Sequence, residues 1–166
     1  QNKLCEYISG YVDGEGCFAL NFRRDVRHER KNKPVYLSWK LQFSIVLRKD
    51  DSEILERIKT TLECGDVSIA KSGQARYQVA DIGALHYKIV PFFEKYSLQA
   101  KKRLDFVLWK EAVDIIFKNM RKDINVRPGI RGFTKTHWNP KDLDRLKEIH
   151  KEMVVYKSKT KPWKWL

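Results

Sequence analysis

One stretch near the start of the chain, Ile8–Gly16 (I-S-G-Y-V-D-G-E-G), limits what the rest can fold into. Apolar side chains recur through it at helical spacing, which predicts a helix over residues 4–14. Gly10 and Gly14 fall on one face of that helix, although each interior glycine costs a helix about 1 kcal/mol. Close approach of a second helix to this face explains the glycine pair best. An ordinary amphipathic helix with a glycine-rich C-terminal cap is the alternative.

The two acidic residues of this stretch lie at a change of secondary structure. The strand-like run Cys17–Phe22 follows directly, so Asp13 and Glu15 are expected where a helix ends and a strand begins. The pattern resembles the LAGLIDADG motif of homing endonucleases in its glycine pair, its Asp-Gly-Glu-Gly ending and the strand after it. The resemblance covers residues 1–120, and it implies a DNA endonuclease with that family's fold.

The charge of the chain points to the same class of ligand. Its 166 residues carry 34 Lys and Arg against 21 Asp and Glu, a net charge of +13. Such an excess favours a polyanionic partner, with nucleic acid as the first candidate and an acidic membrane surface as the second. No apolar run approaches the ~20 residues of a membrane span, and we expect neither a membrane nor a small-molecule substrate as partner.

The cysteines bear on the cellular setting. There are three, widely spaced and without a CxxC pair, which indicates neither a zinc site nor a disulfide framework. This usage favours a reducing, intracellular environment, and it does not distinguish the cytoplasm, the nucleus and an organelle.

The hydrophobic pattern predicts an α+β fold in the order α-β-β-α-β-β-α-α. Period-two alternation marks strands with one buried and one exposed face, and apolar residues three and four apart mark helices. After the first helix, the expected segments are strands over 17–24 and 35–47, a helix over 52–64, strands over 66–71 and 75–81, a helical run from 82 broken at Pro91, and helices over 98–120 and 139–156. The order matches the resemblance, which implies a four-stranded, twisted antiparallel sheet backed by helices.

The chain is expected to divide into a core and a C-terminal extension. Residues 1–120 form the endonuclease core, and residues 121–166 form a loop, a helix and a basic, Trp-rich tail that packs on the core or extends it. Basic residues and tryptophans alternate in this extension, which predicts contacts with DNA or a second subunit: Arg127, Arg131, Lys135, Lys157–Lys164, Trp138, Trp163 and Trp165. A packed extra helix with a frayed end explains the segment equally well.

The exposed face of the predicted sheet is suited to reading DNA. Asn and Gln suit adenine edges, and Arg and Lys suit guanine edges. The candidate DNA contacts are Asn21, Arg23, Lys40, Gln42, Ser44, Arg48, Ser68, Arg76 and Gln78, with Arg30 in the charged run between the first two strands. A solvated strand face is the alternative for each residue, and a solvated loop explains the charged run equally well.

The resemblance also implies a cleavage site. Phosphodiester hydrolysis uses divalent cations, and hard cations such as Mg²⁺ take oxygen ligands. Glu15 aligns with the metal-binding acid of the family motif and the Gly14 carbonyl with a second ligand, whereas Asp13 aligns with a chiefly structural acid. The expected cofactor is Mg²⁺, or Mn²⁺ or Ca²⁺ in its place.

Basic groups near the scissile phosphate complete the site implied by the family. Lys102 and Lys101 are the candidates, because they precede the long helix, and a solvated helix start is the alternative. Leu47, followed by Arg48, stands where the family often carries a glutamine. This difference leaves the role of positioning the attacking water without a residue.

A single motif resembles the homodimeric branch of the family, in which two motif helices pack at the two-fold axis. The expected interface residues are Ile8, Gly10, Tyr11 and Gly14. Two-fold symmetry predicts a pseudo-palindromic site. The function implied is a double-strand break with short 3′ overhangs that starts the mobility of an encoding intron. An intron RNA maturase and a non-catalytic DNA-binding regulator on the same fold are the alternatives, and Glu15 argues against lost catalysis.

Overall fold

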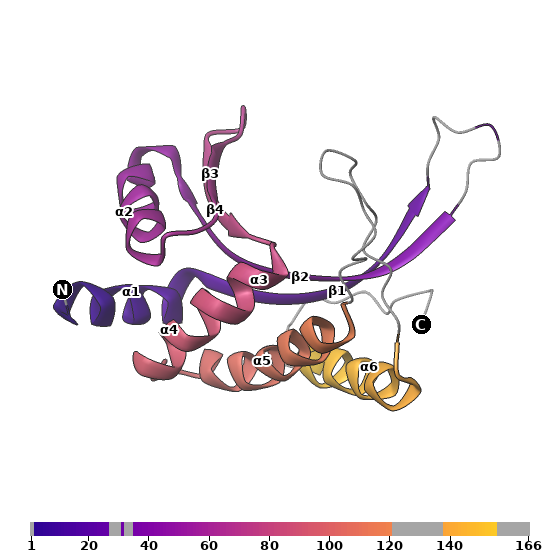
Figure 1. Ribbon diagram of the computed structural model, residues 1–166. Helices are drawn as coiled ribbons and strands as arrows, with labels where there is room; N and C mark the ends of the chain where they lie inside the picture. Colours follow the sequence, from indigo (N-terminus) through magenta and orange to yellow (C-terminus); the bar gives the residue numbers. More distant parts are fainter. Residues whose placement is uncertain (1, 27–30, 32–34, 121–137, 156–166) are drawn as a thin grey trace, which may run out of the picture.

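A sheet and the helices that back it make up the computed structural model (Figure 1). The structure describes residues 2–26, 31, 35–120 and 138–155. Several predicted contacts lie outside the described residues and stay predictions: Arg30, Arg127, Arg131, Lys135, Lys157–Lys164, Trp163 and Trp165.

The elements follow the predicted order. They are α1 (Asn2–Glu15), β1 (Gly16–Val26), β2 (Val35–Arg48), η1 (Lys49–Asp51), α2 (Ser52–Leu62), β3 (Asp66–Ile69), β4 (Gln74–Val79), α3 (Ile82–Ala84), η2 (Leu85–Ile89), α4 (Val90–Lys95), α5 (Lys102–Asn119) and α6 (Pro140–Val155). The strands pair antiparallel in the order β1-β2-β4-β3, so the predicted fold class is confirmed. None of the described helices has the length and apolar character that a membrane span needs.

The sheet buries one face and leaves the other uncovered by these helices. In Figure 1, α4, α5 and α6 lie along one side of the long β1–β2 hairpin, and α2 lies beside β3 and β4. The buried hydrophobic side chains of the strands alternate, as predicted, and are Phe18, Leu20, Trp39, Leu41, Phe43, Ile45, Ala75, Tyr77 and Val79.

Phe18 lies at the centre of the contact between sheet and helices. Its ring centroid is 5.1 Å from that of Phe43, 5.5 Å from that of Phe93 in α4 and 5.0 Å from that of Trp109 in α5. Burial of one such ring stabilises the folded state by about 1.5–3 kcal/mol. The Trp109 indole N–H also donates to the Ala19 carbonyl at 3.2 Å, so α5 is fixed against β1 close to the start of that strand.

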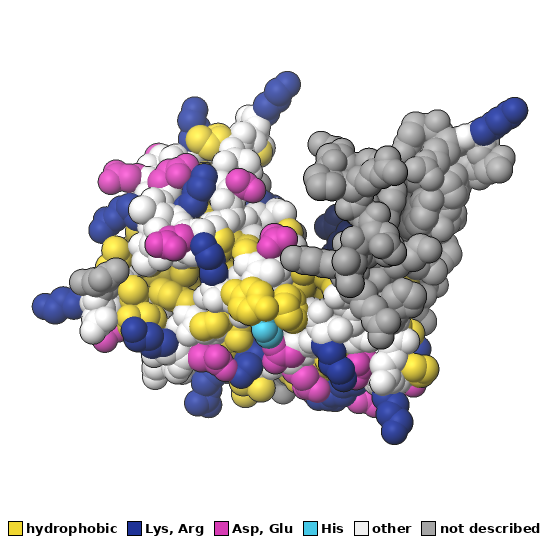
Figure 2. Space-filling model, viewed as in Figure 1, with side chains coloured by type: hydrophobic (Ala, Val, Ile, Leu, Met, Phe, Trp, Pro, Cys, Tyr) yellow, Lys and Arg dark blue, Asp and Glu magenta, His cyan; other side chains and the backbone are white. Residues whose placement is uncertain are grey.

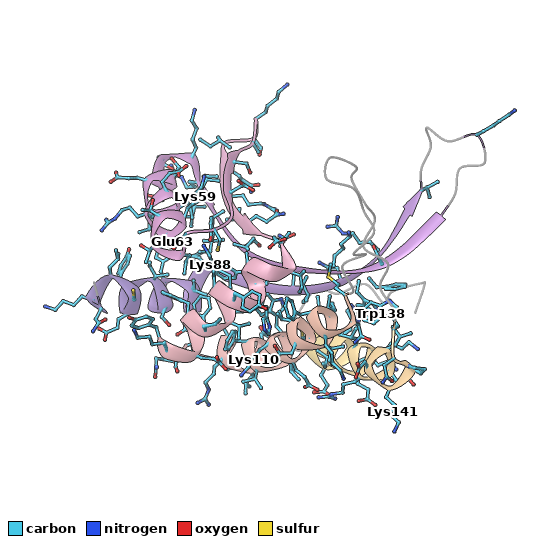
Figure 3. The ribbon with its side chains drawn as sticks, viewed as in Figure 1. Lys59, Glu63, Lys88, Lys110, Trp138 and Lys141 are labelled. Carbon is cyan, nitrogen blue, oxygen red and sulfur yellow. The ribbon has the colours of Figure 1, made fainter. Side chains whose placement is uncertain are left out.

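Polar contacts hold the α2 end of the molecule against the helical run. Lys88 in η2 donates to the backbone carbonyl of Glu63 at 2.6 Å (Figure 3), and Glu63 ends α2 in a left-handed conformation with φ of 52°. The Tyr77 hydroxyl donates to the carbonyl of Cys64 at 2.9 Å. The turn after α2 is therefore tied both to β4 and to η2.

The prediction that Pro91 breaks the helix is wrong. Residues 82–95 form one continuous helical run in which the π-helical turn η2 directly precedes Pro91, and the N–H of Val90 bonds to the carbonyl of Leu85. A proline in an α-helix clashes with the carbonyl four residues earlier. A wider turn before the proline relieves that clash, so the helix continues through Pro91.

α6 packs against α5 through paired charges. Arg145 binds both carboxylate oxygens of Glu111, with Nε–Oε1 at 2.7 Å and Nη2–Oε2 at 2.8 Å. Asn119 donates to Asp142 at 2.8 Å near the other end of the contact. The described part of the C-terminal extension thus packs on the core.

Candidate nucleic-acid interface and cleavage site

α1 passes into β1 without an intervening loop. Glu15 is the last residue of the helix and Gly16 the first of the strand, as the sequence predicts. Gly16 is buried, and a Cβ atom there would lie 2.4 Å from Val12 Cγ1 and 2.8 Å from the Val12 carbonyl oxygen. The glycine is therefore required for the strand to begin this close to the helix, and the Glu15 side chain is left exposed at the junction.

Lys102, at the start of α5, reaches this junction. Its ammonium donates to the carbonyl oxygen of Gly14 at 3.2 Å and to that of Gly16. Burial lowers the pKa of Lys102, against the opposing effect of the Cys17 thiol and of nearby carboxylates that include Glu15. The C-terminus of a helix is its negative end, which favours an ammonium at this position.

Lys101 does not share this position. It precedes the first residue of α5, and its exposed side chain makes no hydrogen bond or ion pair within the described residues. Of the two candidate lysines, the structure brings Lys102 alone to the carbonyl oxygens at the end of the motif helix.

Asp13 has a different environment from Glu15. Its carboxylate accepts the backbone N–H of Gln99 at 2.7 Å and that of Ala100 at 3.2 Å. It therefore fastens the segment before α5 to the last turn of α1, two residues ahead of Lys102. This contact agrees with the structural role that the motif implies for Asp13.

The polar side chains predicted to contact DNA share one face of the sheet. In register, Asn21 lies opposite Lys40 on the neighbouring strand, and Ser68 lies opposite Arg76. Exposed members of the set are Arg23, Lys40, Arg48, Ser68 and Arg76, and half-buried members are Asn21, Gln42 and Gln78. Strand alternation and register thus bring the predicted contacts together.

The prediction that Ser44 is exposed on this face is wrong, because the residue is only 5% exposed. In register between Cys17 and Gln78, it lies in the middle of the sheet, where larger neighbours cover a small side chain. Gln74, at the start of β4, is exposed on the same face and was not predicted. Side chains alternate along a strand, and Gln74 is two residues before Arg76, so the same pattern places it on the polar face.

A hollow of about 500 Å³ opens on this face where β4 ends and β2 continues. Residues that line it from the sheet are Arg23, Lys40, Gln42, Arg76 and Gln78, with Trp39 and Leu41 from the same strand as Lys40. Three lining side chains are basic and one, that of Asp81, is acidic, so the charge of the hollow is net positive. The view in Figure 2 shows acidic and basic side chains mixed over the helices.

A second exposed surface is the face of α1 that carries two glycines. Within the described part of the chain, no atom lies within 4 Å of where a Cβ of Gly10 or Gly14 would stand. Tyr11 is half-buried on this helix, and Tyr7, which was not predicted, is 53% exposed with its ring 5.9 Å from that of Tyr11. Tyr7 is one turn before Tyr11, a spacing that would have indicated it.

Ile8 does not belong to this surface, and the prediction that it does is wrong. Its exposed fraction is 0%, and it packs in the core with Val12. Gly10 is two positions after Ile8, which is a rotation of about 200° around a helix. Ile8 therefore points to the core side of α1, away from the glycine face.

Residues 8–113 match the family model described as LAGLIDADG endonuclease. The chain belongs to this family. Among curated relatives, "Probable intron-encoded endonuclease 2" of Neurospora crassa is 30% identical over 68% of this chain, and "Probable intron-encoded DNA endonuclease 1" of Mycosarcoma maydis is 31% identical over 62% of it. The chain spans 24% and 34% of the lengths of these two relatives.

Solved structures of the family share the fold. The homing endonuclease I-TnaI superposes with a TM-score of 0.68 and 25% identity, over 90% of this chain and 86% of its own. The enzyme I-SmaMI, bound to an uncleaved DNA target in the presence of calcium ions, superposes with a TM-score of 0.68 and 21% identity, over 89% of this chain and 44% of its own.

The donor atoms at the α1–β1 junction fit the divalent cation that LAGLIDADG endonucleases use. The Glu15 carboxylate is exposed, and the carbonyl of the preceding residue, Gly14, is at the helix end. Both are oxygen ligands of the kind that Mg²⁺ and Ca²⁺ prefer, together with water and phosphate oxygens. Within the described residues no group of three or more His, Cys, Asp or Glu side chains is placed to hold a metal ion.

Proposed function

We propose that this chain is a homing endonuclease that binds a long DNA site and, as a homodimer, cuts both strands. The α1–β1 junction carries the proposal. There, the exposed acid Glu15 directly follows Gly14, whose carbonyl oxygen accepts a hydrogen bond from the ammonium of Lys102. An exposed acid, carbonyl oxygens at a helix end and a half-buried ammonium are groups that phosphodiester cleavage needs and that a simple binding surface does not.

The polar sheet face is proposed to read the DNA. Arg and Lys suit guanine edges and phosphates, and Asn and Gln suit adenine edges. The 11 residues of β1, at about 3.3 Å each, span about 36 Å, close to one turn of duplex DNA. Two copies related by a two-fold axis would then cover a pseudo-palindromic site of about 20 base pairs.

The α1–β1 junction is proposed to cut the DNA. A bound Mg²⁺ supplies an activated water and offsets charge on the leaving oxygen. Glu15 and the Gly14 carbonyl hold that cation, with Mn²⁺ or Ca²⁺ able to take its place, and Lys102 stabilises the charge that develops on the scissile phosphate. Leu47 is half-buried against the core, so its side chain contributes no polar group to positioning the water.

The second active site is proposed to come from a second copy of the chain. The exposed glycine face of α1 lets another motif helix approach closely, which brings two Glu15 residues near the axis. The expected product is a double-strand break with short 3′ overhangs. The printed names of the relatives, intron-encoded endonucleases, support the further proposal that this break starts the mobility of an intron.

A cleavage assay on a plasmid library spanning the intron-insertion junction of the gene of origin tests this function. Wild type should cut with Mg²⁺ and should not cut with EDTA. Glu15→Gln should bind the same site in a gel shift without cutting it. Glu56→Gln, which removes an equally exposed acid from α2, should cut like wild type.

Two outcomes would contradict the proposal. If Glu15→Gln cut at close to the original rate, the assignment of Glu15 as metal ligand would be wrong, and Asp13 would become the candidate. If the wild-type chain bound the junction specifically and never cut it, the regulator on the same fold would replace the endonuclease.

A further inference from the structure

The Lys102 ammonium occupies an oxygen atom that the proposed divalent cation would need. It donates to the carbonyl of Gly14 at 3.2 Å and to that of Gly16, and the Gly14 carbonyl is one of the two ligands that the proposed function gives to the cation. Two cations at one oxygen repel strongly, and the more so where burial limits screening by water. The ammonium and the divalent cation therefore compete for this oxygen.

The end of α1 explains why a lysine binds there. The last carbonyl groups of a helix have no partner within it, and they form the negative end of the helix dipole. The last turn of α1 contains no basic residue of its own. Lys102 supplies the missing positive charge and hydrogen bonds from another element, α5.

We propose that Lys102 is the resident cation of the metal-free site and that a divalent cation displaces it from the Gly14 carbonyl. Once displaced, the ammonium is free to meet a phosphate oxygen of bound DNA. Occupation of the site by the divalent cation and release of the lysine toward the substrate are then a single event. The inference rests on the proposed function for the identity of the two cation ligands.

The structure allows this exchange with little movement of the backbone. Asp13 binds the N–H groups of Gln99 and Ala100, so the segment before Lys102 is fastened to α1. The lysine side chain is a flexible four-carbon stem. Rotation of that stem alone releases Gly14, while the start of α5 stays in place.

Displacement has a measurable consequence for affinity. A site that is competent for only a fraction of the time binds its ligand more weakly by that fraction. Removal of the Lys102 ammonium should therefore tighten the binding of divalent cations. Removal of the Lys101 ammonium, which has the same charge but no contact with the junction, should change the binding much less.

Calorimetric titration of the full chain with Ca²⁺, without DNA, tests this. Lys102→Met should bind Ca²⁺ about tenfold more tightly than wild type, and Lys101→Met should lie close to wild type. Glu15→Gln should lose the binding. Equal affinities of the two lysine variants, or no Ca²⁺ binding by Lys102→Met, would overturn the inference.

A second measurement needs no substitution and so does not depend on the folding of a variant. An amine-reactive ester is applied to the wild-type chain, with EDTA or at a Ca²⁺ concentration that fills the site by calorimetry, and modified lysines are quantified by mass spectrometry. Lys102 should react several-fold faster with Ca²⁺, and Lys101 should react equally in both. An unchanged Lys102 rate would overturn the displacement.

The Glu15 variant separates the two possible failures. If Glu15→Gln bound Ca²⁺ as tightly as wild type, the proposed cation site itself would fall. If Glu15→Gln did not bind Ca²⁺, while Lys102→Met had the wild-type affinity and Ca²⁺ left the reactivity of Lys102 unchanged, the cation site would be supported. Only the displacement of Lys102 would then be wrong.

Discussion

The carboxylate of Asp13 accepts a 2.7 Å hydrogen bond from the backbone N–H of Gln99, and so it joins the last turn of the motif helix to the segment that leads into α5. The same carboxylate accepts the next N–H, that of Ala100, at 3.2 Å. Glu15, two residues further on, is exposed. The two acids of the motif therefore differ in what they stabilise, and their substitutions should differ in what they change.

Asp13→Asn should destabilise the fold. The substitution removes the charge and turns one acceptor into a donor that faces a backbone N–H, and hydrogen bonds to charged groups contribute about 1.5–3 kcal/mol. Glu15→Gln should change stability by less than about 0.5 kcal/mol, because an exposed side chain has little to lose. Urea unfolding of both variants measures the difference. Equal stabilities would contradict the structural role of Asp13.

The contact between α5 and α6 should weaken in acid. Hydrogen bonds from Arg145 lower the pKa of Glu111, and the same pair raises the pKa of Arg145. A carboxylate with a lowered pKa in the folded state contributes stability above its unfolded pKa, about 4.3 for Glu. That contribution is lost as the pH falls through the lower folded value.

Glu111→Gln measures this contribution. Both partners are more than a third exposed, so we expect a loss of at most about 1 kcal/mol near pH 7, and a smaller difference from wild type near pH 3. Urea unfolding at the two pH values gives both numbers. If the stability difference between Glu111→Gln and wild type grew toward low pH, the prediction would be contradicted.

Most of the fold could be predicted because burial in a sheet has a period of two. Phe18 and Leu20 on β1 and Phe43 and Ile45 on β2 are buried as their alternation indicates, and the same count places Arg76 on the opposite face. A period says which way a side chain points, and it says nothing of how large its neighbours are. Ser44 points to the polar face and is nevertheless covered.

The cleavage site was harder to predict because its geometry depends on contacts between distant elements. Lys101 and Lys102 are equivalent in sequence, and only the packing of α5 beside the α1–β1 junction brings one of them to Gly14. Ile8 belongs to the motif, which predicts an interface role, but its helical phase points it to the core. The π-helical turn before Pro91 leaves no pattern in the apolar residues.

Arg76→Ala should relax sequence discrimination. Arg76 is exposed on the polar face, in register with Ser68 and Val46, and a good contact between a side chain and a base contributes about 1–3 kcal/mol of discrimination. The loss should fall on one or two base positions of each half-site. Competition binding against a library of single-base variants of the target measures it.

Arg57→Ala is the matched control for charge. Arg57 is exposed on α2 and not on the sheet, so its removal should leave the order of preference among the library members unchanged. Gln42→Ala should behave like Arg76→Ala at a different base position. Uniform weakening by both sheet variants would mean that this face contacts phosphates and does not read bases.

Gly10→Ala and Gly16→Ala should have opposite effects on the isolated chain. Gly10 has open space where a Cβ would stand, and alanine in place of an interior helical glycine gains about 0.5–1 kcal/mol. A Cβ at Gly16 would overlap Val12, and overpacking of this kind costs about 1–3 kcal/mol. The midpoint temperature of thermal unfolding, measured at low protein concentration, should therefore rise for Gly10→Ala and fall for Gly16→Ala.

The same Gly10 variant tests the pairing of the motif helices. If a second α1 lies against this face, the added methyl group separates the two helices, so the variant that stabilises each chain should weaken the dimer. Sedimentation over a range of concentrations, with Gly83→Ala as a control on another helix, measures that affinity. A Gly10→Ala chain that was both more stable and dimerised as tightly as wild type would show that the partner helix does not pack here, and the two Glu15 residues would then not meet across this face.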